Sequence, residues 1–134
     1  MHMTRETDYA LAILRCLAVR GERTDAASIA SSVSVPPRFT LKILRKLVLK
    51  GLVKSYKGSR GGYVLAQPPE KITFRDAIEA IDGPIAVNRC ISGFSCLRVD
   101  SREVADCAVH LKLYRVNALL VQALDNIKIA DVME

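Results

Sequence analysis

Three of the four cysteines lie close together in the second half of the chain, in the pattern Cys90-x5-Cys96-x10-Cys107-x2-His110. Thiolates are soft ligands that suit zinc or an iron–sulfur cluster, and three thiolates with one histidine could complete a tetrahedral zinc site. The spacing alone favours zinc and a cluster about equally, with free or disulfide-forming thiols as a third possibility. His110 would share a helical face with Cys107, but it is equally well explained as an ordinary polar helix residue.

A second pattern with chemical meaning is a stripe of positive charge on a helix expected over residues 36–50. Four cations recur there at i, i+4, i+7 and i+8, on the side opposite the apolar residues. Residues 36–60 contain eight basic side chains and no acidic one. A helix with one apolar and one cationic face is suited to lie along DNA phosphates. The stripe consists of Arg38, Lys42, Arg45 and Lys46.

Charge is divided unevenly along the 134 residues. The net charge is +6, with a net of +8 in residues 1–66 and −2 in residues 67–134. A basic first half and a mildly acidic second half indicate a polyanion-binding module joined to a different element. The chain has two histidines, no Ser/His/Asp-like set and no phosphate-binding glycine signature, so we do not expect an enzyme.

The elements that must position the basic stripe read as a winged helix-turn-helix. Helices are expected over residues 4–19 and from residue 25 or 26 to 32, followed by the basic helix. Cys16 falls on an apolar face of the first helix and is expected in the core. Two β-like runs, 52–56 and 63–66, flank a glycine-rich turn that carries Lys57, Ser59 and Arg60. An arginine at the tip of such a wing could enter a minor groove.

The second half is expected to connect this module to a dimerisation helix. Residues 67–70 form a connector, Thr73 and Asp76 cap a fourth helix that ends at residues 82–84, and residues 85–100 lack a clear period. Asp100 and Glu103 are expected to open a long helix that reaches about Lys128. An apolar stripe along that helix is too long for a small winged helix to cover, which favours a two-fold dimer over an intramolecular core helix.

The sequence therefore predicts a mainly α fold with a small β-hairpin, in which a winged helix-turn-helix precedes a long C-terminal dimerisation helix. The expected divisions are a DNA-binding region (1–66), a connector with the fourth helix (67–84), a cysteine-bearing sensor loop (85–102), and the dimerisation helix with its tail (103–134). No apolar run approaches the ~20 residues needed to cross a bilayer. The first residues are too charged for a signal peptide, so we expect a cytoplasmic protein.

Taken together, these features resemble the bacterial winged-helix iron–sulfur regulators typified by IscR, NsrR and RirA. The resemblance covers nearly the whole chain. It rests on Thr-Asp-Tyr-Ala-Leu at 7–11, on the helix end at 41–51 followed by Leu52-Val53, and on the wing Gly-Ser-Arg-Gly-Gly-Tyr-Val-Leu at 58–65. The three downstream cysteines match the cluster loop of this family.

This resemblance implies a homodimer that binds a palindromic operator in double-stranded DNA and responds to redox state, iron or nitric oxide through an iron–sulfur cluster. The cluster type, 2Fe–2S or 4Fe–4S, stays open. It also implies Cys90, Cys96 and Cys107 as ligands; the fourth ligand is Asp8 or Glu6 from the partner, or His110. The alternative is a winged-helix regulator that uses its cysteines for zinc or as a thiol switch. The expected DNA-binding residues are Arg38, Thr40, Lys42, Arg45, Lys46, Lys57, Ser59 and Arg60.

Overall fold

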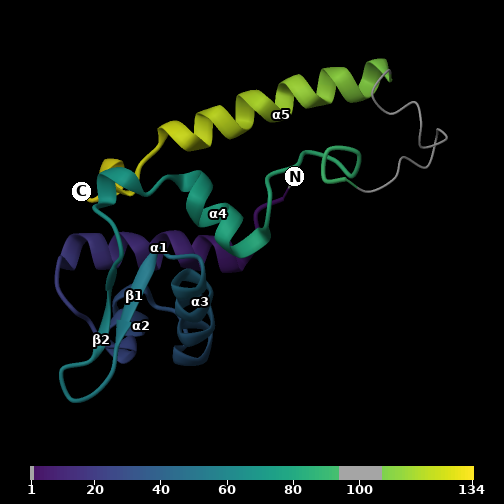
Figure 1. The fold of residues 1–134 in the computed structure, drawn as a ribbon. Helices are drawn as coiled ribbons and strands as arrows, with labels where there is room; N and C mark the ends of the chain where they lie inside the picture. The colour runs from purple at the N-terminus through teal and green to yellow at the C-terminus, as the bar shows by residue number, and fades with distance from the viewer. Residues whose placement is uncertain (1, 94–106) are drawn as a thin grey trace.

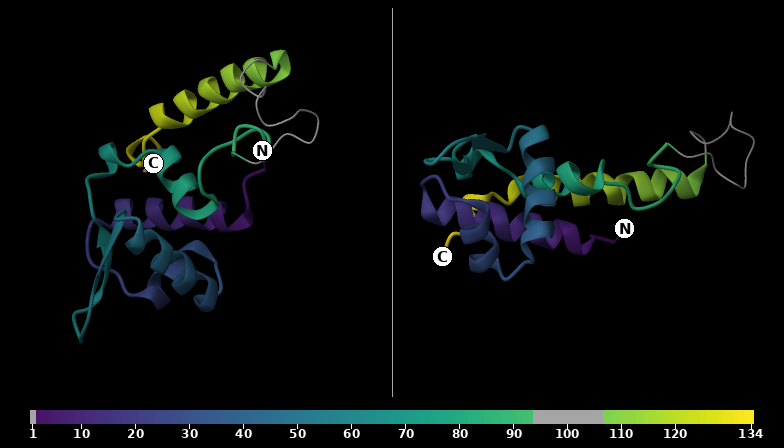
Figure 2. Two further views of the ribbon diagram at one scale, coloured as in Figure 1. Left: turned by 45° about the vertical axis from the view of Figure 1, so that its right-hand side comes forward. Right: turned by 90° about the horizontal axis from the view of Figure 1, so that it is seen from below.

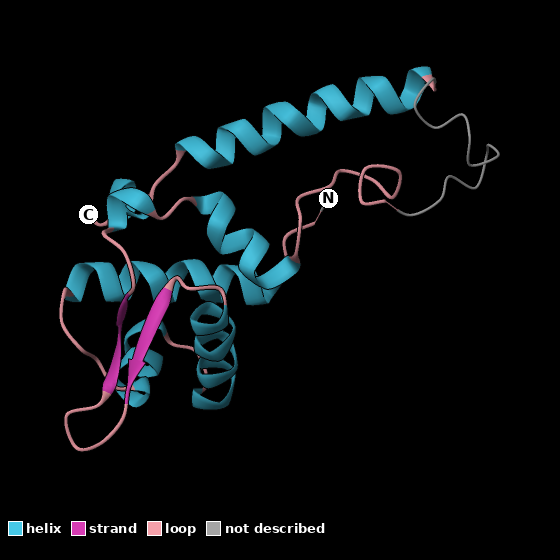
Figure 3. Ribbon diagram, viewed as in Figure 1, coloured by secondary structure: helices cyan, strands magenta, loops and turns pink. Residues whose placement is uncertain are grey.

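The computed structural model of the chain describes residues 2–93 and 107–134. Its described elements are mostly helical, with one two-stranded antiparallel hairpin, as the sequence predicts (Figures 1 and 3). The helices are α1 (Arg5–Arg20), α2 (Ala26–Val33), α3 (Pro37–Leu49), α4 (Phe74–Asp82) and α5 (Ala108–Asn126). The strands are β1 (Val53–Tyr56) and β2 (Gly62–Leu65), and two 3-10 helices are η1 (Pro69–Lys71) and η3 (Ile129–Val132).

The first helix, α1, runs through the middle of the molecule. Thr4 caps its start, and Gly21 ends it in the left-handed region, where a glycine carries no steric penalty. On one side of α1 lie α2, α3 and the hairpin, and on the other side lie α4 and η3 (Figure 1). The core forms where these elements meet, around Ile13, Leu14 and Leu17 of α1.

The buried face of α1 leaves out Cys16, which the sequence placed in the core. Ala10 and Leu14 are buried, whereas Ala12 and Cys16 are only half-buried and line a shallow hollow between α1 and α2. The expectation of a core position for Cys16 is therefore wrong. Because most positions from 9 to 19 are apolar, periodicity alone does not fix which face meets the core.

The hairpin is fastened to the loop between α1 and α2 near its turn, at the start of β2. Tyr63 and Thr24 exchange two backbone hydrogen bonds, at 2.9 and 3.0 Å. Gly62 makes this approach possible: a Cβ at this position would lie 2.8 Å from the Thr24 carbonyl oxygen, and its φ of +147° disfavours other residues. At least one wing glycine therefore serves contact within the chain, in addition to any close approach to another molecule.

The second half folds back onto the first. Thr73 and Asp76 form the predicted capping box of α4. Residues 72–74 pair with residues 127–129, which brings the end of α5 beside the start of α4, and Ile129 of η3 is fully buried. Arg15 of α1 donates hydrogen bonds to the backbone carbonyls of Val132 and Glu134.

The last helix, α5, is shorter than predicted and extends beyond the rest of the molecule (Figures 1 and 2). Its 19 residues span about 28 Å at 1.5 Å per residue. It begins at Ala108, with Cys107 at its N-cap position, so Cys107 precedes the helix rather than lying on it. The predicted capping pair at Asp100 and Glu103 lies outside the described residues. No helix within 2–93 and 107–134 is long and apolar enough to cross a membrane.

Candidate nucleic-acid interface and cysteine site

The candidate DNA-binding surface consists of the outer face of α3 and the tip of the hairpin. Both project from α1 on the side opposite α5 (Figure 1). Ser34, in the left-handed region at the end of α2, and Pro36–Pro37 form the tight turn into α3. The apolar side of α3 packs into the core, so its cations face outward, as the spacing predicted. Exposed on this surface are Arg38, Lys42, Arg45, Lys57, Ser59 and Arg60.

Thr40 does not belong to this surface. Its side chain is fully buried, and its hydroxyl donates to the carbonyl oxygens of Val35 and Pro36 at 3.4 and 3.2 Å. The residue lies three positions before Ile43 and four before Leu44, so the periodicity that buries these two side chains also buries Thr40. Its role is to fix the turn into α3, and the predicted contact with DNA is not available to its side chain.

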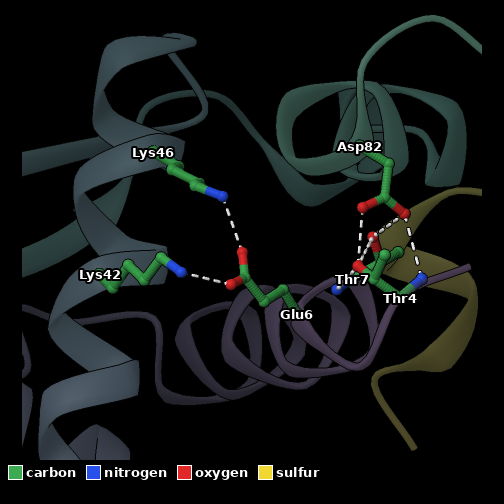
Figure 4. A network of polar contacts seen from close by, with 6 residues as sticks. All are labelled: Thr4, Glu6, Thr7, Lys42, Lys46 and Asp82. Atoms are coloured by element: carbon green, nitrogen blue, oxygen red, sulfur yellow. Dashed lines mark hydrogen bonds and ion pairs between the residues drawn. The ribbon is translucent and has the colours of Figure 1, made fainter.

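The basic stripe of α3 is partly neutralised within the chain. The Glu6 carboxylate of α1 accepts hydrogen bonds from the Lys42 ammonium at 2.5 Å and from the Lys46 ammonium at 2.7 Å (Figure 4). These hydrogen bonds, from Lys42 first and then Lys46, hold the pKa of Glu6 below its ordinary value, so the carboxylate is ionised at neutral pH. The positive charge on the outer face of α3 is therefore concentrated at Arg38 and Arg45.

An arginine that the sequence analysis missed lies beside the end of β1, next to the turn of the wing. The guanidinium of Arg23 stacks over the Tyr56 ring, 3.5 Å from its centre. Such a contact combines cation–π attraction with apolar packing and leaves the edge of the guanidinium open for an anion. Arg23 lies 33 positions before Tyr56 in the chain, in a loop with no repeating pattern, so only the folded hairpin reveals the pair.

The predicted cysteine site is only partly within the described residues. Cys90 lies before the undescribed range 94–106, Cys107 follows it, and Cys96 lies inside it. Among residues 2–93 and 107–134, no group of three His, Cys, Asp or Glu side chains is arranged to hold a metal ion. Because Cys96 lies outside the described residues, the site with three thiolates stays a prediction.

Two of the three candidate fourth ligands remain chemically open. Asp8 is exposed on α1, and His110 lies in the first turn of α5, three residues after Cys107. The Nδ1 atom of His110 is buried and has no hydrogen-bond partner among the described residues. A buried imidazole nitrogen without a partner is costly, and a metal or cluster would satisfy it. Glu6 is already engaged by two lysines, which makes it the least suitable of the three.

Asn117 of α5 holds the segment that leads to Cys90. Its side chain is nearly buried; its amide nitrogen donates to the Ile85 carbonyl at 3.1 Å, and its amide oxygen accepts from the Val87 amide at 2.9 Å. One asparagine thus fixes residues 85–87 against the middle of α5. A polar residue within the apolar pattern of this helix is the signal in the sequence that points to this contact.

The end of α4 is held to the start of α1 by a compact group of hydrogen bonds. The Asp82 carboxylate accepts from the hydroxyls of Thr4 and Thr7, both at 2.7 Å, and from the backbone amide of Thr4 at 3.2 Å (Figure 4). Burial favours the neutral form of Asp82, but these hydrogen bonds outweigh it and hold its pKa below the ordinary value. The segment 83–93, which includes Cys90, therefore follows a residue that is held against the first turn of α1.

The exposed apolar surface of α5 differs from the single stripe that the sequence predicted. Leu113, Leu120 and Leu124 are half-buried on the side where Asn117 is buried, whereas Val109 and Val116 point away from the chain. The side of Val109 and Val116 also bears Leu119, which is 67% exposed, whereas Tyr114, 59% exposed, lies on the opposite flank of the helix. The residues on the side of Val109 alternate in steps of three and four, which is the spacing of the contact line between two packed helices. They are Val109, Lys112, Val116, Leu119 and Ala123.

A winged helix-turn-helix with a cationic outer face is the architecture of DNA-binding transcription regulators. The model of the Rrf2 family, described as iron-dependent transcriptional regulators, matches residues 3–134. The chain belongs to this family. The family consists of regulators of transcription and not of enzymes, in agreement with the sequence analysis.

Individual relatives and solved structures support the same assignment. A helix-turn-helix transcriptional regulator of Mycobacterium tuberculosis is 36% identical over 93 residues, which cover 68% of this chain and 58% of that protein. The structure of CymR, the global cysteine regulator of Bacillus subtilis, is similar with a TM-score of 0.76 and 26% identity, over 99% of this chain and 96% of that one. IscR of T. potens shares the fold, with a TM-score of 0.73 and 23% identity over 99% and 86%.

Proposed function

We propose that this chain forms a homodimer that binds a palindromic operator in double-stranded DNA and regulates transcription in response to an iron–sulfur cluster. The observation that carries the DNA-binding part is the exposure of Arg38 and Arg45 on α3 and of Arg60 on the wing, two elements that lie on the same side of α1 (Figure 1). The description of the family as iron-dependent supports the cluster. A regulator of this kind acts on cytoplasmic DNA, which agrees with the location expected from the sequence.

The division of work on DNA follows from the positions of the cations. The outer face of α3 enters the major groove, where Arg38 and Arg45 contact phosphates or base edges. Arg60 at the tip of the wing enters the adjacent minor groove, and Lys57 and Ser59 contact the backbone beside it. With ~6–10 phosphate contacts per dimer, affinity should fall ~10³–10⁵-fold between about 50 and 200 mM salt.

The homodimer is formed through α5. The outward face of this helix presents Val109, Val116 and Leu119 in one line, with no covering element in the described part of the chain. A second copy of the same face, related by a two-fold axis, would cover it. The two recognition helices would then meet half-sites about one DNA turn apart, which accounts for a palindromic operator.

Cys90, Cys96 and Cys107 would hold the cluster, with His110 of the same chain or Asp8 from the partner as the fourth ligand. The donor chemistry fits, since thiolates prefer iron–sulfur clusters and His110 presents a buried nitrogen in need of a partner. When bound, the cluster supplies a redox-active group that oxygen, nitric oxide or iron shortage can alter. Asn117 and Asp82 fix the two ends of the segment 83–87, so that Cys90 emerges from an anchored backbone.

A second candidate function is a winged-helix regulator that uses the same cysteines for zinc or as a thiol switch. The buried Nδ1 of His110, which has no hydrogen-bond partner among the described residues, favours it, because zinc sites combine thiolates with an imidazole. In this case His110 would complete a zinc site with three thiolates, or the thiols would respond to oxidation directly.

Anaerobic purification followed by visible spectroscopy and iron, sulfide and zinc analysis separates the two functions. A brown protein with sulfide-to-iron charge-transfer bands supports the cluster, and a colourless zinc-loaded protein supports the alternative. Cys107→Ala should abolish metal binding in both, whereas Cys16→Ala, in the half-buried α1 position, is the matched control and should leave it unchanged. Reconstitution of Asp8→Ala and His110→Ala then identifies the fourth ligand.

A further inference from the structure

One acidic side chain of α1 lies between two lysines of the recognition helix. The two oxygens of the Glu6 carboxylate each accept one hydrogen bond, from Lys42 and from Lys46, which are one helical turn apart on α3 (Figure 4). The Glu6 side chain is 29% exposed, and those of Lys42 and Lys46 are 52% and 35% exposed. All three groups are thus accessible from the surface that would face DNA.

The position of Glu6 is set by the rest of the fold. Glu6 lies in the first turn of α1, between Thr4 and Thr7, and both threonines are hydrogen-bonded to Asp82 of α4. Thr4 also caps the helix by accepting from the amide of Thr7. Glu6 therefore projects from a turn that is held on two sides, and it meets the lysines across the packed interface of α1 and α3.

We propose that Glu6 competes with DNA phosphates for Lys42 and Lys46, and thereby limits the affinity of this protein for DNA of any sequence. A carboxylate and a phosphate oxygen accept hydrogen bonds from the same ammonium group. A lysine that stays with Glu6 neutralises no phosphate and releases no counterion. The two lysines then act as a reserve of positive charge, and specific binding depends more on Arg38, Arg45 and the wing.

This inference rests on the proposed DNA-binding function and deepens it. The test is Glu6→Gln, which keeps the size of the side chain and removes its charge. Binding to a short duplex of random sequence should tighten by about 8-fold for each released lysine at about 0.1 M salt, and the salt slope should steepen by about 0.9 per lysine. Glu22→Gln is the matched control: it removes one negative charge from the same half, from a side chain without a salt bridge in the described residues.

A second set of variants tests whether the effect of Glu6→Gln on DNA binding depends on the two lysines. In Lys42→Gln/Lys46→Gln protein, the further change Glu6→Gln should change DNA affinity no more than Glu22→Gln does, since no lysine remains to be released. A change in metal content would persist in this background and is measured in each preparation. Thermal unfolding of every variant separates an effect on binding from an effect on folding.

The possible outcomes distinguish a failure of this inference from a failure of the proposed DNA-binding function. Tighter binding by Glu6→Gln that disappears in the double-lysine background supports the competition. Binding equal to or weaker than that of Glu22→Gln, or a gain of the same size without the lysines, overturns it while the regulator function stands. If the unaltered protein shows no salt-dependent binding to duplex DNA, both the proposed function and this inference fail.

Discussion

The side chain of Asn117 should determine whether the segment before Cys90 stays ordered against α5. It bridges the Ile85 carbonyl and the Val87 amide, at 3.1 and 2.9 Å, from a nearly buried position. Asn117→Ala removes both hydrogen bonds and most of the side chain. Asn117→Leu removes the hydrogen bonds but keeps a side chain of similar size. Comparison of the two substitutions separates hydrogen bonding from packing.

The expected loss follows from the two hydrogen bonds. Each contributes about 0.5–1.5 kcal/mol net, and a buried group that loses its partner costs more, about 1–3 kcal/mol. Asn117 also borders an open hollow with Tyr114 and Gln122, through which water can reach the freed groups. We therefore expect Asn117→Ala to lower the free energy of unfolding by about 2 kcal/mol, with no recovery in Asn117→Leu.

Two measurements test this expectation. Urea unfolding at fixed protein concentration gives the free-energy change, since any dimerisation makes stability depend on concentration. Amide hydrogen exchange gives the local effect: the amide of Val87 should exchange faster in both Asn117 variants. Gln122→Ala, on the exposed side of the same hollow, is the matched control and should change neither quantity.

Unchanged exchange at Val87 in Asn117→Ala would refute the reasoning, because the hydrogen bond from that amide to Asn117 would then give it no protection. Recovery of full stability in Asn117→Leu would refute it differently, by showing that volume and not hydrogen bonding matters. A faster exchange confined to residues 85–87, with less than about 0.5 kcal/mol of global change, would show that the segment opens independently of the core.

Three further predictions concern the wing, the dimer and acid. Gly62→Ala should destabilise the fold by about 2–4 kcal/mol in thermal or urea unfolding, because the added Cβ would lie 2.8 Å from the Thr24 carbonyl oxygen. Gly58→Ala is the control, since Gly58 also has a positive φ but has open space around it. Equal losses of stability in the two variants would contradict the close approach at Gly62. Leu119→Asp should weaken self-association at least about tenfold in analytical ultracentrifugation, and an unchanged dimer would remove α5 as the interface. The hydrogen bonds to Glu6, from Lys42 first, lower its pKa from the ordinary 4.5. The stability that they provide is therefore present above about pH 4.5 and is lost as pH falls through the lower pKa of the folded state. The difference in melting temperature between the unaltered protein and Glu6→Gln should shrink over that range, and parallel curves of melting temperature against pH would argue against it.

Local signals in the sequence predicted the elements well, because caps and turns depend on neighbouring residues. The helix α1 ends at Arg20, within one residue of the expected end, and Thr73 with Asp76 caps α4 as expected. The wing was also predicted from its glycines and flanking strands. These features require only the few residues on either side of them, so a single sequence is sufficient.

Features that depend on distant residues were predicted less well. Thr40 was assigned to the DNA-facing side, but the packing of α3 against α1 places it in the core. The neutralising partner of Lys42 lies 36 positions away, so a count of charges within residues 36–60 could not include it. Cys107 was placed on a helix that begins one residue later. The ligand set and the DNA contacts themselves stay predictions.

The hydrogen bonds of Asp82 with Thr4 and Thr7 bear on how far this chain is modular. The recognition helix α3 and the helix α4, which precedes Cys90, both contact the first turn of α1. Glu6 in that turn binds Lys42 of α3, and the threonines on either side of Glu6 bind Asp82 of α4. A winged helix transplanted from a relative without matching threonines would lose this joint even if every DNA-contacting residue were kept. Exchange of specificity between family members therefore needs a boundary after α4 rather than after the hairpin, with residues 4–7 and 82 transferred as a unit.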